Sequence, residues 1–221
     1  MASGAAILLS SLMTLVTASV SRPDVPSELP EFFADLDTSG YAFHLYGWLG
    51  LIGLVLAVPF TYGLFLLVRG ALNHAWLGAV GMWAGLIVLF PAYVFNILMV
   101  SKMTPLFADL GGSAADSVFV VYETYVGFGS ILFLAGSLLT FSLAPWLLSV
   151  AWLRTRVGAR WIGRLGVFAG VTGLAWAGLL IDEPGALAAL WAVNAFANII
   201  WMIAVGATMA RSQASKKPAE A

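Results

Sequence analysis

The residues best suited to chemistry in this chain lie in an apolar stretch, "VFVVYETYVGFGS" at 118–130. Glu123 is its only carboxylate, and Tyr122 and Tyr125 lie close on either side. An ionisable group inside a membrane is costly to bury, so it is by default a candidate proton acceptor or cation contact. Glu123 is therefore the first candidate for a functional residue. The alternative is that Glu123 is hydrated, or paired internally, near the end of a membrane helix.

Few other polar side chains interrupt the apolar parts of the chain. Asn194 and Asn198 are one turn apart and share a helical face, and asparagines in membranes commonly join helices through hydrogen bonds. His44 fits an interfacial position better than a metal site. If successive helices alternate in direction, these groups share the outer half of the bundle. The sequence thus predicts an outward-facing polar pocket around Glu123 that also includes His44, Asn96, Tyr122, Tyr125, Asn194 and Asn198.

Several chemistries are excluded by the residues that the chain carries. It has no cysteine and two histidines, His44 and His74, which the predicted topology places on opposite faces of the membrane, so they cannot share a haem. It has no Gly-x-Ser-x-Gly elbow, no His-Glu-x-x-His motif and no phosphate-binding glycine loop. We therefore expect no catalytic residue, no metal and no cofactor, and an enzyme is the minority hypothesis.

The elements that position these residues are predicted to be membrane helices. Charged residues make up 10% of the chain and hydrophobic residues 61%, whereas soluble domains have roughly 25% charged residues. Each bilayer crossing needs about 20 apolar residues. The sequence predicts an all-α, polytopic transmembrane bundle that forms one domain over 1–210, followed by a polar cytoplasmic tail at 211–221. Its six apolar runs are roughly 3–20, 43–68, 75–100, 118–150, 162–181 and 186–209.

Two of these runs need comment. The run at 3–20 has no basic residue before it, which favours a retained helix over a cleaved signal peptide. The run at 118–150 is too long for one crossing, so we expect a break near Pro145. Residues 146–152 would then lie at the interface, with Trp146 and Trp152 at headgroup depth. The longer loops, 21–42 and 101–117, fall on the outer side.

Basic residues predict the orientation. Positively charged loops stay on the cytoplasmic side, and with six spans most basic residues fall on one side. Both termini are therefore predicted to be cytoplasmic, with the protein in the cytoplasmic (inner) membrane. The net charge of −1 gives no bias toward nucleic acid. The basic residues on the cytoplasmic side are Arg69, Arg154, Arg156, Arg160, Arg164, Arg211, Lys216 and Lys217.

Glycines predict how the helices pack. Small residues on one face let helix backbones approach closely in lipid. Such a face in the fifth run is formed by Gly163, Gly166, Gly170 and Gly173. The "GFGS" at 127–130 is also interpreted as close packing. A glycine face left open for a partner protein is the alternative.

The pattern of spans resembles a family of small bacterial membrane proteins known only as a domain of unknown function. The likeness lies in the long outer loop, the Tyr- and Gly-bearing fourth helix and the basic turn leading to "RWIGRLGVFAGVTGLAW" at 160–176. The resemblance implies a six-helix bundle and no catalytic residues. We expect a non-catalytic accessory subunit that associates with other membrane proteins or with itself. The alternatives are a small-molecule binding or transport protein with a pocket around Glu123, and a membrane enzyme acting on a lipid or quinone.

Overall fold

The protein is built from helices. Its computed structural model describes residues 26–104, 114–180 and 184–214, and these ranges contain no strand, which confirms the all-α prediction. The predicted span at 3–20 lies outside the described residues. In chain order the elements are η1 (Pro26–Glu28), α2 (Leu29–Val68), η2 (Arg69–Ala71), α3 (Leu72–Leu98), η3 (Met99–Met103), α5 (Ala114–Ser137), η4 (Leu138–Leu143), α6 (Ala144–Thr155), α7 (Arg160–Thr172), η5 (Gly173–Leu180) and α8 (Pro184–Ala214).

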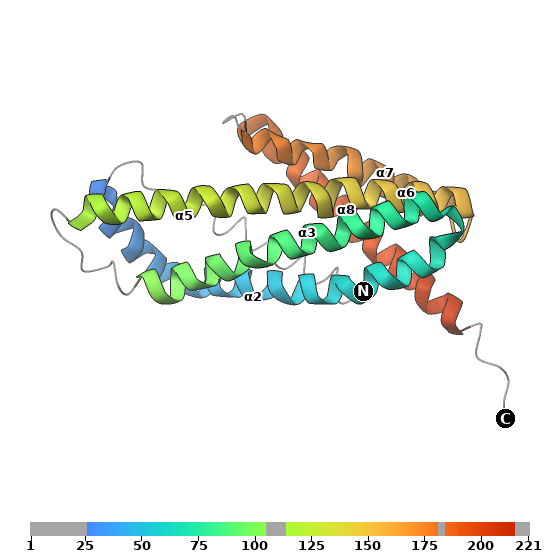
Figure 1. The fold of residues 1–221 in the computed structure, drawn as a ribbon, viewed down its shortest axis with the longest axis horizontal. Coiled ribbons are helices and arrows are strands. Elements are labelled where there is room, and N and C mark those ends of the chain that lie inside the picture. Colours follow the sequence, from blue (N-terminus) through green and yellow to red (C-terminus); the bar gives the residue numbers. More distant parts are fainter. Residues whose placement is uncertain (1–25, 105–113, 181–183, 215–221) are drawn as a thin grey trace, which may run out of the picture.

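Three segments are long and apolar enough to cross a membrane, His44–Phe95, Asp116–Thr155 and Ala189–Ser212. The first contains η2, where the chain reverses, so α2 and α3 lie side by side as a hairpin (Figure 1). Large apolar side chains such as those of Val55 and Ile87 are exposed on the outside of the helices. Such surfaces are expected where lipid is the solvent, and together with the three segments they indicate a membrane protein.

Local sequence explains where several helices begin and end. Pro30 lies in the first turn of α2, where a proline removes no helical hydrogen bond. After α6 the chain turns at Arg156, which has a left-handed φ of 53° and donates its N–H to the Trp152 carbonyl at 3.0 Å. Gly158 lets this turn lie against Trp152, because a Cβ at Gly158 would lie 2.5 Å from Cζ2 of the indole.

The helix bounds differ from the predicted runs in two places. α2 begins at Leu29, so much of the predicted loop 21–42 is helical, and it buries Phe32 and Phe33. The break expected near Pro145 is a π-helical turn, η4, directly before it, and helix then continues to Thr155. The side chain of Trp152 is 1% exposed and packs in the core of the bundle, and its predicted headgroup depth stays a prediction.

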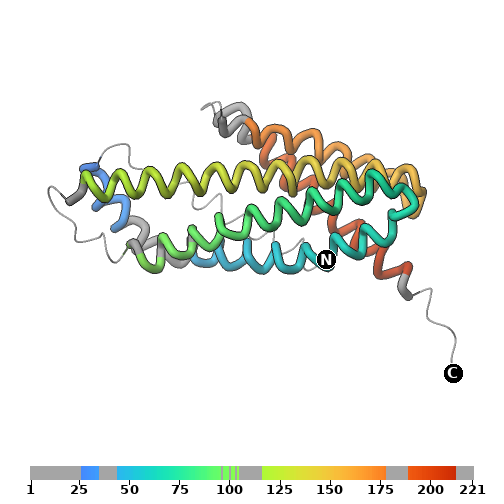
Figure 2. Tube along the Cα trace, in the orientation of Figure 1, coloured from blue at the N-terminus to red at the C-terminus, as the bar shows by residue number. Residues whose placement is uncertain are grey.

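We call the continuous helix of α5, η4 and α6 the rod (114–155). α3 lies along the rod, whereas α7, η5 and α8 pack on its C-terminal part, where Phe133 contacts Trp176 (Figure 2). We call residues 133–155 the covered half. α8 also reaches α2 there, and Phe60 meets Trp201 with ring centroids 6.1 Å apart. The remaining residues, 114–132, form the open half, which packs against α3 and η1.

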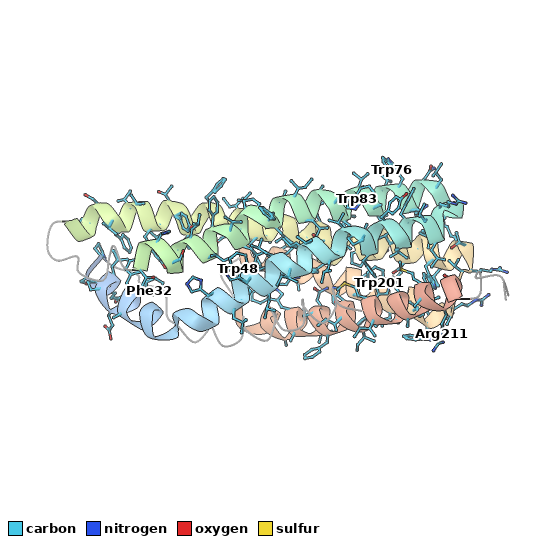
Figure 3. The ribbon with its side chains drawn as sticks, turned by 90° about the horizontal axis from the view of Figure 1, so that it is seen from below. Phe32, Trp48, Trp76, Trp83, Trp201 and Arg211 are labelled. Carbon is cyan, nitrogen blue, oxygen red and sulfur yellow. The ribbon has the colours of Figure 1, made fainter. Side chains whose placement is uncertain are left out.

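The molecule has two separate cores. The larger, which we call the bundle core, runs through the covered half and includes Leu64, Leu148 and Trp201. The smaller, which we call the aromatic cluster, consists of Leu29, Phe32, Phe33 and Tyr122 at the opposite end. Figure 3 shows this separation, with Phe32 at one end of the bundle and Trp76 and Arg211 at the other.

Candidate functional site

Asn194 and Asn198 of α8 belong to the bundle core. In a regular α-helix the N–H at position 145 would donate to the Phe141 carbonyl, but Pro145 has no N–H. Nδ2 of Asn194 and Nδ2 of Asn198 each donate to that carbonyl at 3.1 Å. Both side chains are 1% exposed. The two asparagines therefore bind the carbonyl that the proline leaves without its helical donor.

Asn194 also connects the helices that cover the rod. Its Nδ2 donates to the Ala169 carbonyl at 2.6 Å, and its Oδ1 accepts from Trp176 Nε1 at 3.0 Å. Nearby, Ser142 Oγ donates to the Gly170 carbonyl at 2.6 Å. Buried polar groups in membranes join helices in this way because lipid offers them no partner. This network fixes the register of α7, η5 and α8 on the rod.

A small cavity lies beside Asn198. Its volume is about 10 Å³, which is close to the least that holds one water molecule. Asn198 Oδ1 and Thr140 Oγ1 have no hydrogen-bond partner among the described residues, and both residues line the cavity. A single water fits both the volume and the two polar atoms, whereas an organic ligand is too large. The five other predicted pocket residues with described side chains, Glu123, His44, Tyr122, Tyr125 and Asn194, do not line this cavity.

The two tyrosines beside Glu123 hold the open half of the rod in place. Tyr122 is 3% exposed and packs edge-on against Phe32 and Phe33, with ring centroids 5.4 and 6.2 Å away. Tyr125 donates its hydroxyl to the Phe95 carbonyl, and the two rings lie 5.1 Å apart. These contacts attach α5 to α2 and α3, so both tyrosines have structural partners.

Glu123 points away from these contacts. Its side chain is exposed, as are those of its neighbours Val120, Val121 and Thr124. His44 is half-buried in α2, and the side chain of Asn96 lies outside the described part of the structure. Tyr122 and Tyr125 therefore lie with the α2 and α3 contacts, Asn194 and Asn198 lie in the bundle core, and Glu123 faces outward. The structure does not bring these residues together around one cavity.

The surface beside Glu123 is open. Of the fifteen glycines whose surroundings are described, thirteen have an atom within 4 Å of the position where a Cβ would stand. Gly127 and Gly129 have none. The prediction that "GFGS" packs closely is therefore wrong within the described chain. Phe128 between them is 54% exposed, and Ile131 is 63% exposed. We call this surface, Val120, Thr124, Gly127, Phe128 and Ile131, the open face.

The glycines of α7 have the opposite surroundings. A Cβ at Gly163 would lie 2.6 Å from Leu153 Cγ, and one at Gly170 would lie 2.5 Å from Trp146 Cβ. A Cβ at Gly173 would lie 2.5 Å from the Phe141 carbonyl oxygen, and Gly166 is in equally close contact with the rod and with α8. These glycines lie where the backbones of α7 and η5 approach the rod.

The described residues supply no metal centre, since no three or more His, Asp or Glu side chains gather closely enough to hold an ion. The sequence reasoning missed two features of the site. The need for a side-chain donor to the Phe141 carbonyl could have been predicted, because Phe141 lies four residues before Pro145. The open face could not have been predicted, because a sequence does not distinguish exposed glycines from packed ones. No protein-family model, curated protein or solved structure matches this chain.

Proposed function

We propose that the protein is a non-catalytic subunit of a membrane complex and that the open face of α5 binds a transmembrane helix of another membrane protein. The observation that supports this most is Gly127, which has no atom of the described residues within 4 Å of its Cβ position. Small residues are the usual contact surface between helices in lipid, where apolar surface alone gives little drive to associate. A partner helix could approach the α5 backbone at Gly127 as closely as the rod approaches α7.

The length of the rod supports the same proposal. Asp116–Thr155 has 40 residues, or about 60 Å at 1.5 Å per residue. The hydrocarbon core is about 30 Å thick, and a tilt of up to about 40° does not absorb the difference. Where the open half leaves the lipid, exposed Val120, Val121 and Phe128 meet water, and such a patch marks an interaction surface. Where it stays in lipid, Gly127 leaves a groove in the open face.

The occupant is a helix of a different protein rather than a second copy. Copies in one membrane share an orientation, so a two-fold axis along the membrane normal would pack α5 against α5. Glu123 lies one turn from Gly127 and is exposed on the same side of α5, so the two carboxylates would face each other where the dielectric is low. A different helix with a hydrogen-bond donor at this level avoids that repulsion.

We also propose the membrane topology. The protein crosses the cytoplasmic (inner) membrane of a bacterium six times, with both termini cytoplasmic. The support is the gathering of basic turns at one end, where Arg154 lies beside the α2–α3 turn and Arg211 ends the last helix (Figure 3). Retention of arginine on the cytoplasmic side then orients the aromatic cluster outward.

The two other hypotheses have less support. A pocket around Glu123 for a small molecule would need the asparagines, whose amide groups already bind the Phe141 and Ala169 carbonyls. The cavity beside Asn198 admits nothing larger than water. An enzyme that acts on a lipid or quinone would need reactive groups around a substrate-sized cavity, whereas Glu123 is exposed and the hydroxyl of its neighbour Tyr125 already donates to the Phe95 carbonyl.

Site-directed cross-linking in native membranes tests the proposed function. The chain has no cysteine, so Gly127→Cys carries the only thiol and takes a maleimide photo-cross-linker. Val171→Cys, on α7 and 55% exposed, is the matched control. We expect a discrete adduct from Gly127→Cys, with a second protein identified by mass spectrometry, and none from Val171→Cys.

Three results would overturn the proposal. Equal labelling from both positions would mean non-specific contact with neighbours. An adduct at twice the mass of the protein, containing this chain alone, would replace the partner with a second copy. An intramolecular product with no mass increase would mean that the chain covers its own open face. Gly127→Leu, which fills the groove, should prevent co-purification of the partner while the protein itself stays folded.

A further inference from the structure

A second concave surface lies at the end of the bundle opposite the aromatic cluster. It is formed where the α2–α3 turn meets the end of α6, and its volume is about 550 Å³. It is far larger than the cavity beside Asn198 and opens to the outside. We call it the basic recess, and its lining residues are Gly70, Ala71, Leu72, Asn73, His74, Arg154 and Thr155.

The charges around the basic recess have one sign. Arg154 Nη1 of α6 donates to His74 Nδ1 of α3 at 3.4 Å, which leaves the other ring nitrogen of His74 as a donor. Arg69 comes directly before the turn and is exposed. None of the residues that line the recess is acidic. An anion placed here would meet donors from both walls without a competing carboxylate.

The backbone adds to this preference. The recess includes Leu72, Asn73 and His74, the first residues of α3. A helix N-terminus carries partial positive charge and N–H groups that lack helical partners. Asn73 is exposed and supplies a side-chain amide. A guanidinium, an imidazole, an amide and a helix N-terminus around one recess match the oxygens of a phosphate group.

The surroundings of the basic recess are apolar. Leu72, Trp76 and Leu77 are 60%, 52% and 57% exposed, and Trp76 packs its ring against Phe65. An acyl chain could lie along this surface while its headgroup occupies the recess. Basic pockets between membrane helices bind the anionic headgroups of lipids.

We propose that the basic recess between Gly70–His74 and Arg154 binds the phosphate of an anionic phospholipid. Arg154 holds the phosphate, and His74 and the α3 N-terminus contribute further donors. The bound lipid fills the recess between the α2–α3 hairpin and α6, and so links these two elements at this end of the bundle. This proposal does not depend on the partner proposed for the open face.

Native mass spectrometry of the full-length protein in mild detergent tests the proposal, with phosphatidylglycerol as the anionic probe and phosphatidylcholine as the zwitterionic probe. We expect phosphatidylglycerol to bind at least tenfold more tightly. The double variant Arg154→Gln with His74→Gln should lose most of that preference. Arg164→Gln removes the same charge from an exposed position outside the recess and should change the affinity less than twofold.

Equal binding of the two lipids would overturn the proposal, as would equal losses in the recess variant and Arg164→Gln. Inorganic phosphate at millimolar concentration separates the two sources of a phosphate group. Failure to displace the lipid supports a lipid site, whereas binding and displacement keep the phosphate site and make a soluble ion its ligand. If the double variant does not fold, Arg154→Lys keeps the charge and loses the guanidinium fork, so a reduced preference still supports the proposal.

Discussion

The two halves of the rod belong to one continuous helix, yet their surroundings are opposite. In the covered half, Gly136 approaches Leu89 of α3, and the side chains of Ser142 and Trp146 face glycines of α7. In the open half, Gly127 and Gly129 face nothing within 4 Å. Both halves have the glycine and small-residue content that lets helices approach closely in lipid. The difference is that only one half has its neighbours within the described chain.

The two halves of the rod also differ in the surroundings of their polar groups. Asn194 and Asn198 are buried and bind backbone carbonyls of the covered half. Glu123, in the open half, is exposed. The asparagine amide groups at the covered half donate to carbonyls within the bundle. In the described chain, the open half leaves Glu123 and Gly127 uncovered on one side of α5, and this surface is suited to a partner.

The largest effect is expected when one glycine at each half of the rod is replaced by a larger residue. Gly170→Leu should abolish folding, because the new side chain begins 2.5 Å from Trp146 Cβ and 2.8 Å from the Ser142 carbonyl oxygen. Overpacking typically costs 1 to 3 kcal/mol, and more where a backbone must move. Size-exclusion chromatography in mild detergent should show aggregated Gly170→Leu.

Gly127→Leu is the matched control for that experiment. It adds the same side chain at a position that no atom of the described residues approaches within 4 Å, and leucine is the better helix former. We expect a monodisperse peak and an unchanged unfolding midpoint. Aggregation of Gly127→Leu to the same extent would mean that the open face is covered by the chain itself, and the two halves would not differ.

Tyr122→Ala tests whether the open half is held only by its aromatic cluster. The ring is 3% exposed and contacts Phe32 and Phe33, and removing a buried aromatic side chain costs about 3 kcal/mol. We expect proteolysis near η1 and the start of α5 to increase strongly. Tryptophan fluorescence from Trp152 and Trp201 should stay native, because both lie in the bundle core. Loss of both signals together would show that the two cores unfold as one.

The asparagines allow a finer test of the covered half. Asn198→Leu removes one of the two donors to the Phe141 carbonyl and should lower the free energy of unfolding by about 1 kcal/mol. Pro145→Ala restores a backbone N–H that can donate to the same carbonyl. In that background the cost of Asn198→Leu should fall by at least half, as measured by denaturant unfolding in mixed micelles.

If Asn198→Leu and Pro145→Ala change the free energy of unfolding additively, the Asn198 side chain does not replace the hydrogen-bond donor that Pro145 lacks. Asn194→Leu should cost more than Asn198→Leu, about 2 kcal/mol, because it also breaks bonds to Ala169 and Trp176. A smaller cost for Asn194 would contradict the role of its side chain as the connection between the rod and the helices that cover it.

Composition and patterning alone predicted part of this structure. The low charge and the apolar runs indicated helices, and the runs at 75–100 and 186–209 fall within α3 with η3 and within α8. The three- and four-residue spacing of Gly163, Gly166, Gly170 and Gly173 indicated the face of α7 and η5 that meets the rod. Such features follow from the period of a helix and the chemistry of lipid, which a single sequence displays.

Other features depend on which helix lies next to which. The extension of α2 back to Leu29 depends on Tyr122, almost a hundred positions away, which buries Phe32 and Phe33. The burial of Trp152 depends on the α6–α7 turn, which folds over it, and its Nε1 donates to the Ala159 carbonyl at 3.2 Å. Gly127 and Gly163 are chemically identical in the sequence, and only their neighbours distinguish them.

Glu123→Gln is the smallest change and the most specific test of the open face. The carboxylate is exposed, so the free energy of unfolding should change by no more than about 0.5 kcal/mol. If a different membrane protein occupies the face through close contact at Gly127, glutamine keeps the hydrogen-bonding capacity and the cross-linking yield should persist. If a second copy occupies it, loss of two facing charges removes a repulsion, and a product of twice the protein's mass should become stronger. A rise in that product would therefore assign the open face to self-association, whereas an unchanged pattern supports a different partner.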